Sequence, residues 1–367
     1  MRNGWDLTLF VPGLFGPPAA PVRAIAEGLS VPNLESLLSR SMPLAQRWRG
    51  DSLEGWLFRL FGFQEVADAD WPVAALTYAL DARERIDGWY LRADPVYLRV
   101  DINKLILFDG SAFAVTNEEA EGLAAEINAF YRSSDWRLEV PHPTRWYLRL
   151  GSAQRLRTHP ISEAAAGGEL AALLPEGAEG ARWRRRLNEV QMLLHRSAIN
   201  QAREERGERP INSLWFWGGG RLPPAPKPCW HRVWGRDSLS QALAHHVQTD
   251  YAERPAGAVT WLEQATPGRH LVILEQGDTV CRRFDVEGWR AHIGALEQDW
   301  FAPLAAALQR RQVTSLTLLP GEGLGFLMTA SWSRRWWRRR RPLQYFMSAR
   351  IAPHEASDGS SRGQVLA

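Results

Sequence analysis

The sequence predicts an α/β protein with a mostly parallel sheet, helices on both faces of that sheet, and a small inserted α+β domain. Strands and helices alternate between residues 212 and 319, an order typical of parallel sheets. Residues 5–12 form an apolar run that ends at Pro12-Gly13, as expected for a buried strand followed by a loop. Residues 89–150 instead show strands, one helix and further strands, which indicates the insertion.

Composition bounds the class of protein. The chain has 367 residues, 45% of them hydrophobic and 23% charged, which is ordinary for a globular protein with a large core. No apolar run reaches the roughly 18 residues that a membrane-spanning helix needs, and no signal peptide is recognisable. The net charge of +3 gives no argument for nucleic acid. Cys229 and Cys281 lack CxxC spacing, so we expect no zinc site, no disulfide framework and a cytoplasmic location.

The elements before the insertion follow from local patterns. Residues 5–12 are the first buried strand, and a helix capped near Asn33 covers residues 31–40. Residues 51–63 carry their apolar side chains at helical spacing, which predicts an amphipathic helix.

Inside the insertion, a turn at Asp101 joins two predicted strands. Thr116 and Glu119 fit a capping box that begins a helix ending near Phe130. Residues 163–181 have little pattern, so we expect a surface connection or short helices there. The predicted strands are 89–100, 104–109, 137–140 and 145–150.

After the insertion, a long helix at 183–206 leads to a strand at 212–217 that is expected to re-enter the core sheet. The later predicted elements are a helix at 238–247, a strand at 270–275, a helix at 285–310, a strand at 314–319 and a last strand near 343–350. The predicted domains are therefore 1–87 and 183–352 for the core and 88–182 for the insertion, with a disordered tail at 353–367.

A polar segment rich in arginine and asparagine, residues 195–212, stands directly before the apolar run at 214–217 and the three glycines at 218–220. A glycine loop at the carboxyl end of a strand is where open α/β sheets bind ligands, and arginine suits phosphate or carboxylate. Alternatives stay open: the glycines either cradle an anion with N–H groups or allow a chain reversal, and Arg203 and Arg206 either bind a ligand or pair with nearby glutamates. The predicted ligand-binding residues are Asn200, Arg203, Asn212, Gly218, Gly219, Gly220 and Arg221.

The same segment resembles a signature of archaeal-type cofactor-independent phosphoglycerate mutases, which belong to the alkaline-phosphatase superfamily. That signature has a His-Pro-Val-Asn, an Arg, a Gly, a Pro-Ala-Asn and an apolar strand ending in Gly. The matching positions are His195, Asn200, Arg203, Gly207, Pro210, Asn212 and Gly218. Nearly the whole chain is similar to a bacterial offshoot, the RpfE-type regulatory proteins. The resemblance implies an alkaline-phosphatase-like fold.

The resemblance also implies where metal ligands should lie. Superfamily members use two divalent metals, but Pro12 stands where the first strand should end in Asp, and Arg282 replaces an expected His. Only Asp278 and Glu322 remain as weak metal candidates, enough for a loosely held Mg²⁺ or Mn²⁺. Ser30 is the only nucleophile candidate after the first strand, and no base is nearby. We therefore expect the metal ligands to be largely lost, no cofactor and no identified catalytic residue.

A basic run near the end of the chain suggests other partners. Its six arginines and two tryptophans could grip nucleic acid, an anionic membrane surface or an acidic protein. We favour a solvated crossing whose arginine stems cover the core. The arginines concerned are Arg334, Arg335, Arg338, Arg339, Arg340 and Arg341.

Three functional hypotheses follow. The favoured one is a non-catalytic regulatory or binding protein, similar to phosphoglycerate mutases, that holds a small phosphorylated or carboxylated metabolite or a protein partner. The second is a divergent metal-dependent phosphoglycerate mutase (an isomerase) or phosphatase that uses Asp278 and Glu322. The third is an adaptor that binds an anionic partner through Arg334–Arg341.

Overall fold

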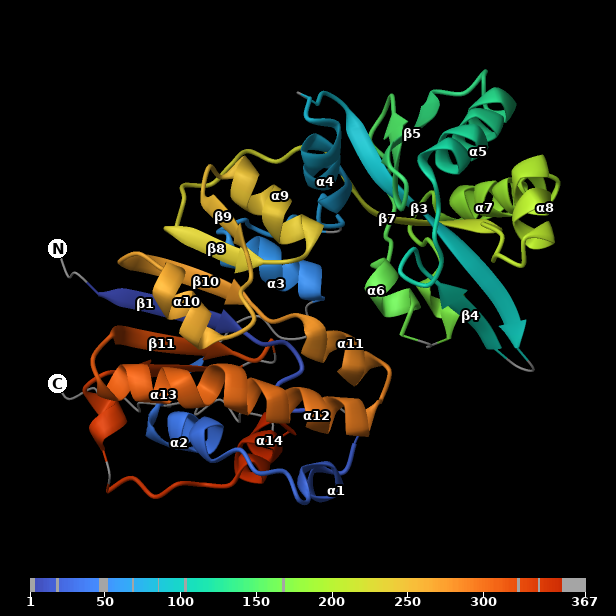
Figure 1. The fold of residues 1–367 in the computed structure, drawn as a ribbon. Helices are drawn as coiled ribbons and strands as arrows, with labels where there is room; N and C mark the ends of the chain where they lie inside the picture. Colours follow the sequence, from blue (N-terminus) through green and yellow to red (C-terminus); the bar gives the residue numbers. More distant parts are fainter. Residues whose placement is uncertain are drawn as a thin grey trace, which may run out of the picture.

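The structure is a computed structural model, and it describes residues 4–17, 20–45, 52–67, 69–84, 86–101, 104–166, 169–321, 324–335 and 337–351. The described residues form two sheets with helices around them (Figure 1). The tail predicted at 353–367 and the candidate Glu322 lie outside the described residues. Within these ranges no helix is both long and apolar enough to span a membrane.

The first sheet confirms the predicted mostly parallel core. Its strand order is β2 (Met42–Ala45), β12 (Leu324–Thr329), β11 (Val313–Leu319), β1 (Trp5–Phe10), β10 (Gly268–Ile273), β8 (Arg232–Gly235) and β9 (Asp250–Glu253). The strands from β11 to β9 run parallel to one another, whereas β12 is antiparallel to β11 and to β2.

Both faces of this sheet are covered by helices, because its central strands are apolar on both sides. Successive residues of β10 alternate: Val272 packs into one core cluster, and Leu271 and Ile273 pack into another. One face carries α1 (Val22–Ala26), α2 (Pro32–Arg40), α10 (Ala258–Gln264), α12 (Val286–Leu296), α13 (Ala302–Gln309) and α14 (Leu343–Ile351). The opposite face carries α3 (Leu53–Leu60), α4 (Val73–Ala82) and α9 (Ser238–His246) (Figure 1).

The second sheet is antiparallel, as expected for the insertion. Its order is β4 (Lys104–Phe108), β3 (Trp89–Asp101), β6 (Arg145–Leu150) and β5 (Trp136–His142), and β7 (Ser213–Gly220) pairs with β3. The helices α5 (Asn117–Phe130) and α7 (Gly180–His195) pack on its outer face. The predicted capping box of α5 is confirmed, because Glu119 N donates to Thr116 Oγ1 over 3.2 Å and Thr116 N donates to Glu119 Oε2 over 3.1 Å.

The expected role of strand 212–217 was wrong. This strand, β7, is not part of the parallel sheet: it pairs antiparallel with β3, with Ser213 opposite Val96. An apolar run buried on both faces fits either sheet, since Trp215 and Trp217 face one cluster and Phe216 faces another. The chain therefore returns to the first sheet at β8, after Gly220 and not at residue 183.

Two further expectations differ from the structure, and a third is met. Residues 343–350 belong to α14 and do not form a strand. The long helix at 183–206 is two helices, because α7 ends at His195 and Ser197 caps α8 (Ala198–Glu205) by accepting a hydrogen bond from Ile199 N. The short helices expected within 163–181 are present, as the end of α6 (Ile161–Ala164) and a 3-10 turn at Leu170–Leu173.

A shared core joins the two sheets. One buried cluster contains Phe10 and Ile273 from the first sheet together with Val96 and Trp215 from the second. The helices α3, α4 and α9 contribute to the same cluster and lie on the side of the first sheet that faces the second sheet (Figure 1). The two sheets are therefore joined by one packed core through these three helices.

Candidate functional site

The connections after β8 and β10 leave the first sheet on opposite sides. After β8 the chain enters α9, whose Leu243 packs in the cluster between the sheets. After β10 it enters α11 (Gln276–Arg282) and α12, whose Trp289 and Ile293 pack in the cluster on the other face. Neighbouring parallel strands whose connections diverge in this way form a topological switch point, where open α/β sheets bind ligands.

Three polar side chains gather at this switch point. Arg254 directly follows β9 and is only 6% exposed. Glu275 lies two residues beyond β10, and His292 of α12 faces the same region, since a Cβ added at Gly277 would lie 3.4 Å from His292 Nε2. Arg254 is close enough to both side chains for its charge to influence their protonation.

Each of these side chains has a buried polar atom that is not hydrogen-bonded to any described residue. The atoms are Arg254 Nε, Glu275 Oε2 and His292 Nε2. Leaving such an atom unpaired costs about 1–3 kcal/mol, and buried polar groups in native proteins are nearly always satisfied. A bound anion, a hydroxyl group or water can satisfy these three atoms.

The electrostatics of the site follow from burial and from mixed charge. Burial raises the pKa of the Glu275 carboxyl, with Asp237 adding to the rise and Arg254 opposing it. Burial also lowers the pKa of His292, and Arg254 lowers it further. His292 is therefore neutral near pH 7, whereas the guanidinium of Arg254 stays protonated. Arg254 is therefore a buried cation beside Glu275 and a neutral His292.

The end of β1 is closed by backbone packing. A Cβ at Gly277 would lie 2.4 Å from the carbonyl oxygen of Pro12, and Gly13 adopts φ +78° against Gly277. The carbonyl of Gly13 accepts hydrogen bonds from Trp289 Nε1 at 2.9 Å and from Cys281 Sγ at 3.3 Å. The place where the resemblance implies an aspartate is thus filled by tightly packed main chain.

The described residues do not fit a two-metal centre. The Asp278 carboxylate accepts a hydrogen bond from Arg282 Nε over 2.6 Å within α11, so a cation already neutralises the predicted metal ligand. Among the described residues no three His, Cys, Asp or Glu side chains are grouped so as to hold a metal ion.

The predicted binding residue Asn200 makes hydrogen bonds to main chain. Its Nδ2 donates to Leu194 O over 2.9 Å and to Ile211 O over 2.8 Å, and its Oδ1 accepts from Ile211 N over 2.8 Å. The side chain is 4% exposed. It ties the end of α7 to the entry of β7.

Asn212 and Arg203 act in the same way. Asn212 pairs with both backbone groups of Leu98, over 2.7 and 2.8 Å, and so extends the β3–β7 pairing. Arg203, which is 1% exposed, binds the carboxylate of Glu119 and the carbonyls of Ala114 and Arg209. For Arg203, the alternative of a glutamate partner is the one that the structure contains.

The glycines do not form a loop, because β7 runs through Gly220. Gly218 has φ +64°, and its N–H donates to Thr158 Oγ1 over 3.1 Å. A Cβ at Gly219 would lie 2.4 Å from the ring of Trp89. Close packing accounts for these glycines, and Arg221 is exposed just beyond the strand.

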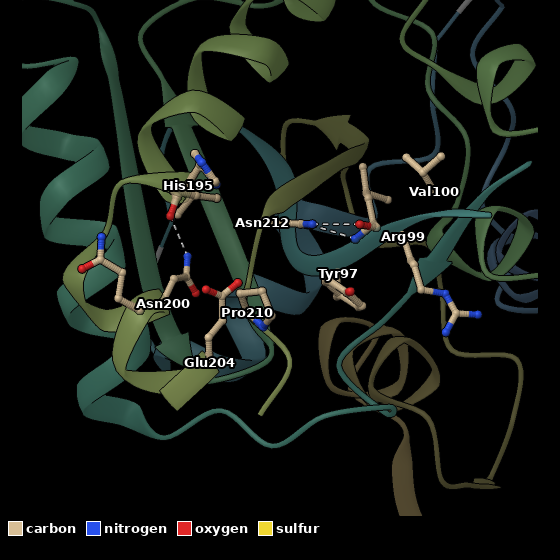
Figure 2. A pocket seen from close by; sticks show the side chains of 11 residues that line it. Tyr97, Arg99, Val100, His195, Asn200, Glu204, Pro210 and Asn212 are labelled. Carbon is tan, nitrogen blue, oxygen red and sulfur yellow. Dashed lines mark hydrogen bonds between the residues drawn. The ribbon is translucent and has the colours of Figure 1, made fainter. Parts of the chain in front are cut away.

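Asn200 and Asn212 do line one cavity, of about 270 Å³, near the α7–α8 junction. Figure 2 shows both amides directed at main-chain groups, with Arg99, His195 and Glu204 around them. Those three side chains are exposed. The cavity is a surface hollow remote from the switch point, and Arg203, Gly218–Gly220 and Arg221 do not line it.

The residues at the switch point were missed at the sequence level, although a signal was present. Glu275 directly follows the apolar run 271–274, the position that faces a ligand at a carboxyl edge. The resemblance instead implies a metal ligand three residues later, at Asp278. Arg254 follows β9, a four-residue strand too short to be predicted from periodicity.

Comparison with known proteins gives a fold likeness only. No protein-family model and no curated protein matches the chain. The structure of PH0037 protein from Pyrococcus horikoshii is similar with a TM-score of 0.52 and 14% sequence identity, over 90% of this chain and 88% of that chain. A cofactor-independent phosphoglycerate mutase from Thermoplasma acidophilum DSM 1728 gives a TM-score of 0.44 and 17% identity, over 92% of this chain and 94% of that one.

Proposed function

We propose that this protein is a regulatory or binding protein that holds a small phosphorylated or carboxylated ligand at the carboxyl edge of its first sheet. The observation that carries the proposal is Arg254, a buried guanidinium whose Nε has no hydrogen-bond partner among the described residues. A cationic, water-excluded donor at a topological switch point matches an anionic ligand group. The proposal replaces the site predicted around Asn200 and Gly218.

The neighbouring side chains support a ligand with hydroxyl groups as well as an anionic group. Glu275 Oε2 accepts a hydrogen bond when ionised, and the unpaired Nε2 of a neutral His292 either donates or accepts one. A small phosphorylated hydroxy acid presents this combination of groups. The resemblance to phosphoglycerate mutases supports the same ligand class, and a regulatory, RpfE-type role in the cytoplasm is part of the proposal.

Binding without turnover is the expected behaviour. The closed end of β1 and the Asp278–Arg282 pair oppose the two-metal chemistry that a phosphoglycerate mutase of this superfamily needs. The purified protein should bind inorganic phosphate or 3-phosphoglycerate in calorimetry and show no mutase or phosphatase activity with added Mn²⁺. Turnover that depends on Mn²⁺ would establish the enzyme hypothesis and overturn this one.

A further inference from the structure

A second surface, independent of the proposed anion site, carries exposed apolar and basic side chains together. It lies on the segment between β12 and α14, which runs past α2 on the side away from the second sheet (Figure 1). We define the aromatic–arginine patch by six residues: Met42, Trp337, Arg338, Arg339, Arg341 and Tyr345.

Hydrogen bonds and one ring contact place Arg338 beside Met42 and Arg341 beside Tyr345, and Trp337 and Arg339 are the chain neighbours of Arg338. Arg338 Nη1 donates to the carbonyl of Ser41 over 3.1 Å, which brings it beside Met42. The backbone N–H of Arg341 donates to Ser39 Oγ over 2.9 Å, and its guanidinium lies 4.1 Å from the ring centre of Tyr345. The segment is therefore fastened to the end of α2 and the start of β2.

The patch brings exposed apolar side chains together with arginines. Trp337 is 64% exposed, Tyr345 48% and Met42 45%, and these three are among the ten large hydrophobic side chains that are strongly exposed within the described residues. Such a gathering marks an interaction site more often than scattered apolar residues do. The nearby carboxylate of Glu35 is already engaged by Arg340 and by Leu343 N.

We propose that the aromatic–arginine patch binds the surface of an anionic lipid membrane. Arginines beside tryptophan and tyrosine match the interface of a bilayer, where aromatic rings lie among headgroups and cations meet anionic lipids. Met42 favours a membrane over a nucleic acid as the partner, because an aliphatic side chain inserts between lipid headgroups and acyl chains but does not stack on bases. The predicted solvated crossing thus becomes a docking surface.

The test is co-sedimentation of the full chain with phosphatidylcholine vesicles, with and without phosphatidylglycerol. The wild type should bind only the anionic vesicles. Each arginine contributes roughly fivefold to such binding, so the triple variant R338Q/R339Q/R341Q should bind roughly a hundredfold more weakly. Trp337→Ala should also weaken binding, and its effect should persist at raised salt because it removes apolar contact.

Matched controls keep the result interpretable. The variant R182Q/R185Q/R196Q removes the same charge from exposed positions on α7 and at its C-cap, and Phe130→Ala removes another exposed aromatic ring. Both should bind vesicles like the wild type. Wild-type protein that ignores anionic vesicles, or that loses as much binding in the controls as in the patch variants, would overturn the proposal. So would binding of a DNA duplex or an acidic peptide that depends on the patch while vesicles do not bind.

Discussion

Glu54 is the buried carboxylate with the clearest consequence for stability. It lies in the first turn of α3, is 7% exposed, and has no hydrogen-bond partner for Oε2 among the described residues. Its Oε1 accepts a hydrogen bond from Ser162 Oγ over 3.2 Å, across the contact between α3 and α6. Burial raises the pKa of Glu54 from 4.5 to about 7, and Arg282 opposes that rise. The folded protein therefore keeps this group protonated in mildly acidic solution.

The sign of the pH dependence follows directly. An unfolded chain releases the Glu54 proton near its ordinary pKa of 4.5, whereas the folded protein holds it until about pH 7. Between these values the folded state binds more protons, so stability falls as the pH rises. The pKa difference corresponds to about 3 kcal/mol in total, at roughly 1.4 kcal/mol for each pKa unit. Above about pH 7 the loss is complete and constant.

Replacement of Glu54 by glutamine removes the ionisation and keeps the shape. The stability of Glu54→Gln relative to the wild type should therefore increase by about 3 kcal/mol between about pH 4.5 and about pH 8. Urea unfolding at a series of pH values measures this difference. Glu121→Gln, at an exposed site of α5, should follow the wild type at every pH. Parallel curves for wild type and Glu54→Gln would refute the reasoning.

Three other outcomes are expected. Asn200→Ala leaves buried main-chain groups unpaired, so it should lower the free energy of unfolding in urea by about 2–4 kcal/mol and leave phosphate affinity unchanged. Lost phosphate affinity at unchanged stability would restore Asn200 as a ligand residue. Gly277→Ala places a Cβ 2.4 Å from Pro12 O, so it should lower the free energy of unfolding by about 2 kcal/mol or more. Gly294→Ala, which has open space around the added Cβ, should be neutral or stabilising in the same assay. Arg254→Met removes a buried cation whose Nε has no hydrogen-bond partner among the described residues, and it should raise the melting temperature without added anion. A lower melting temperature would show that Arg254 is already satisfied.

Much of the fold was predictable because its elements have strong local signals. The apolar runs of β1, β10 and β11 and the capping box at Thr116 all appear where the sequence indicates them. The placement of β7 was not predictable, since periodicity reveals burial on both faces but not the identity of the neighbouring strand. Hydrogen bonding to β3, more than a hundred residues earlier in the chain, decides that question.

The candidate site was harder to predict for the same reason. Asn200, Arg203 and Asn212 look like ligand residues in sequence because polar side chains beside an apolar strand are typical of both binding sites and structural clamps. Only their hydrogen-bond partners show that they hold main chain. Arg254 and His292 come together from different elements, so no spacing along the chain connects them.

Calorimetry with phosphate ligands tests the central claim most directly. Inorganic phosphate and 3-phosphoglycerate should each be titrated into wild-type protein, Arg254→Met and Arg236→Met, the last being an exposed arginine at the same edge that pairs with Glu253. The wild type should bind at least one of the two ligands at a single site. Arg254→Met should bind that ligand at least about tenfold more weakly. Arg236→Met should bind it with an affinity within about threefold of the wild type. Equal affinity of wild type and Arg254→Met, or no binding of either ligand to the wild type, would contradict an anion site at the carboxyl edge.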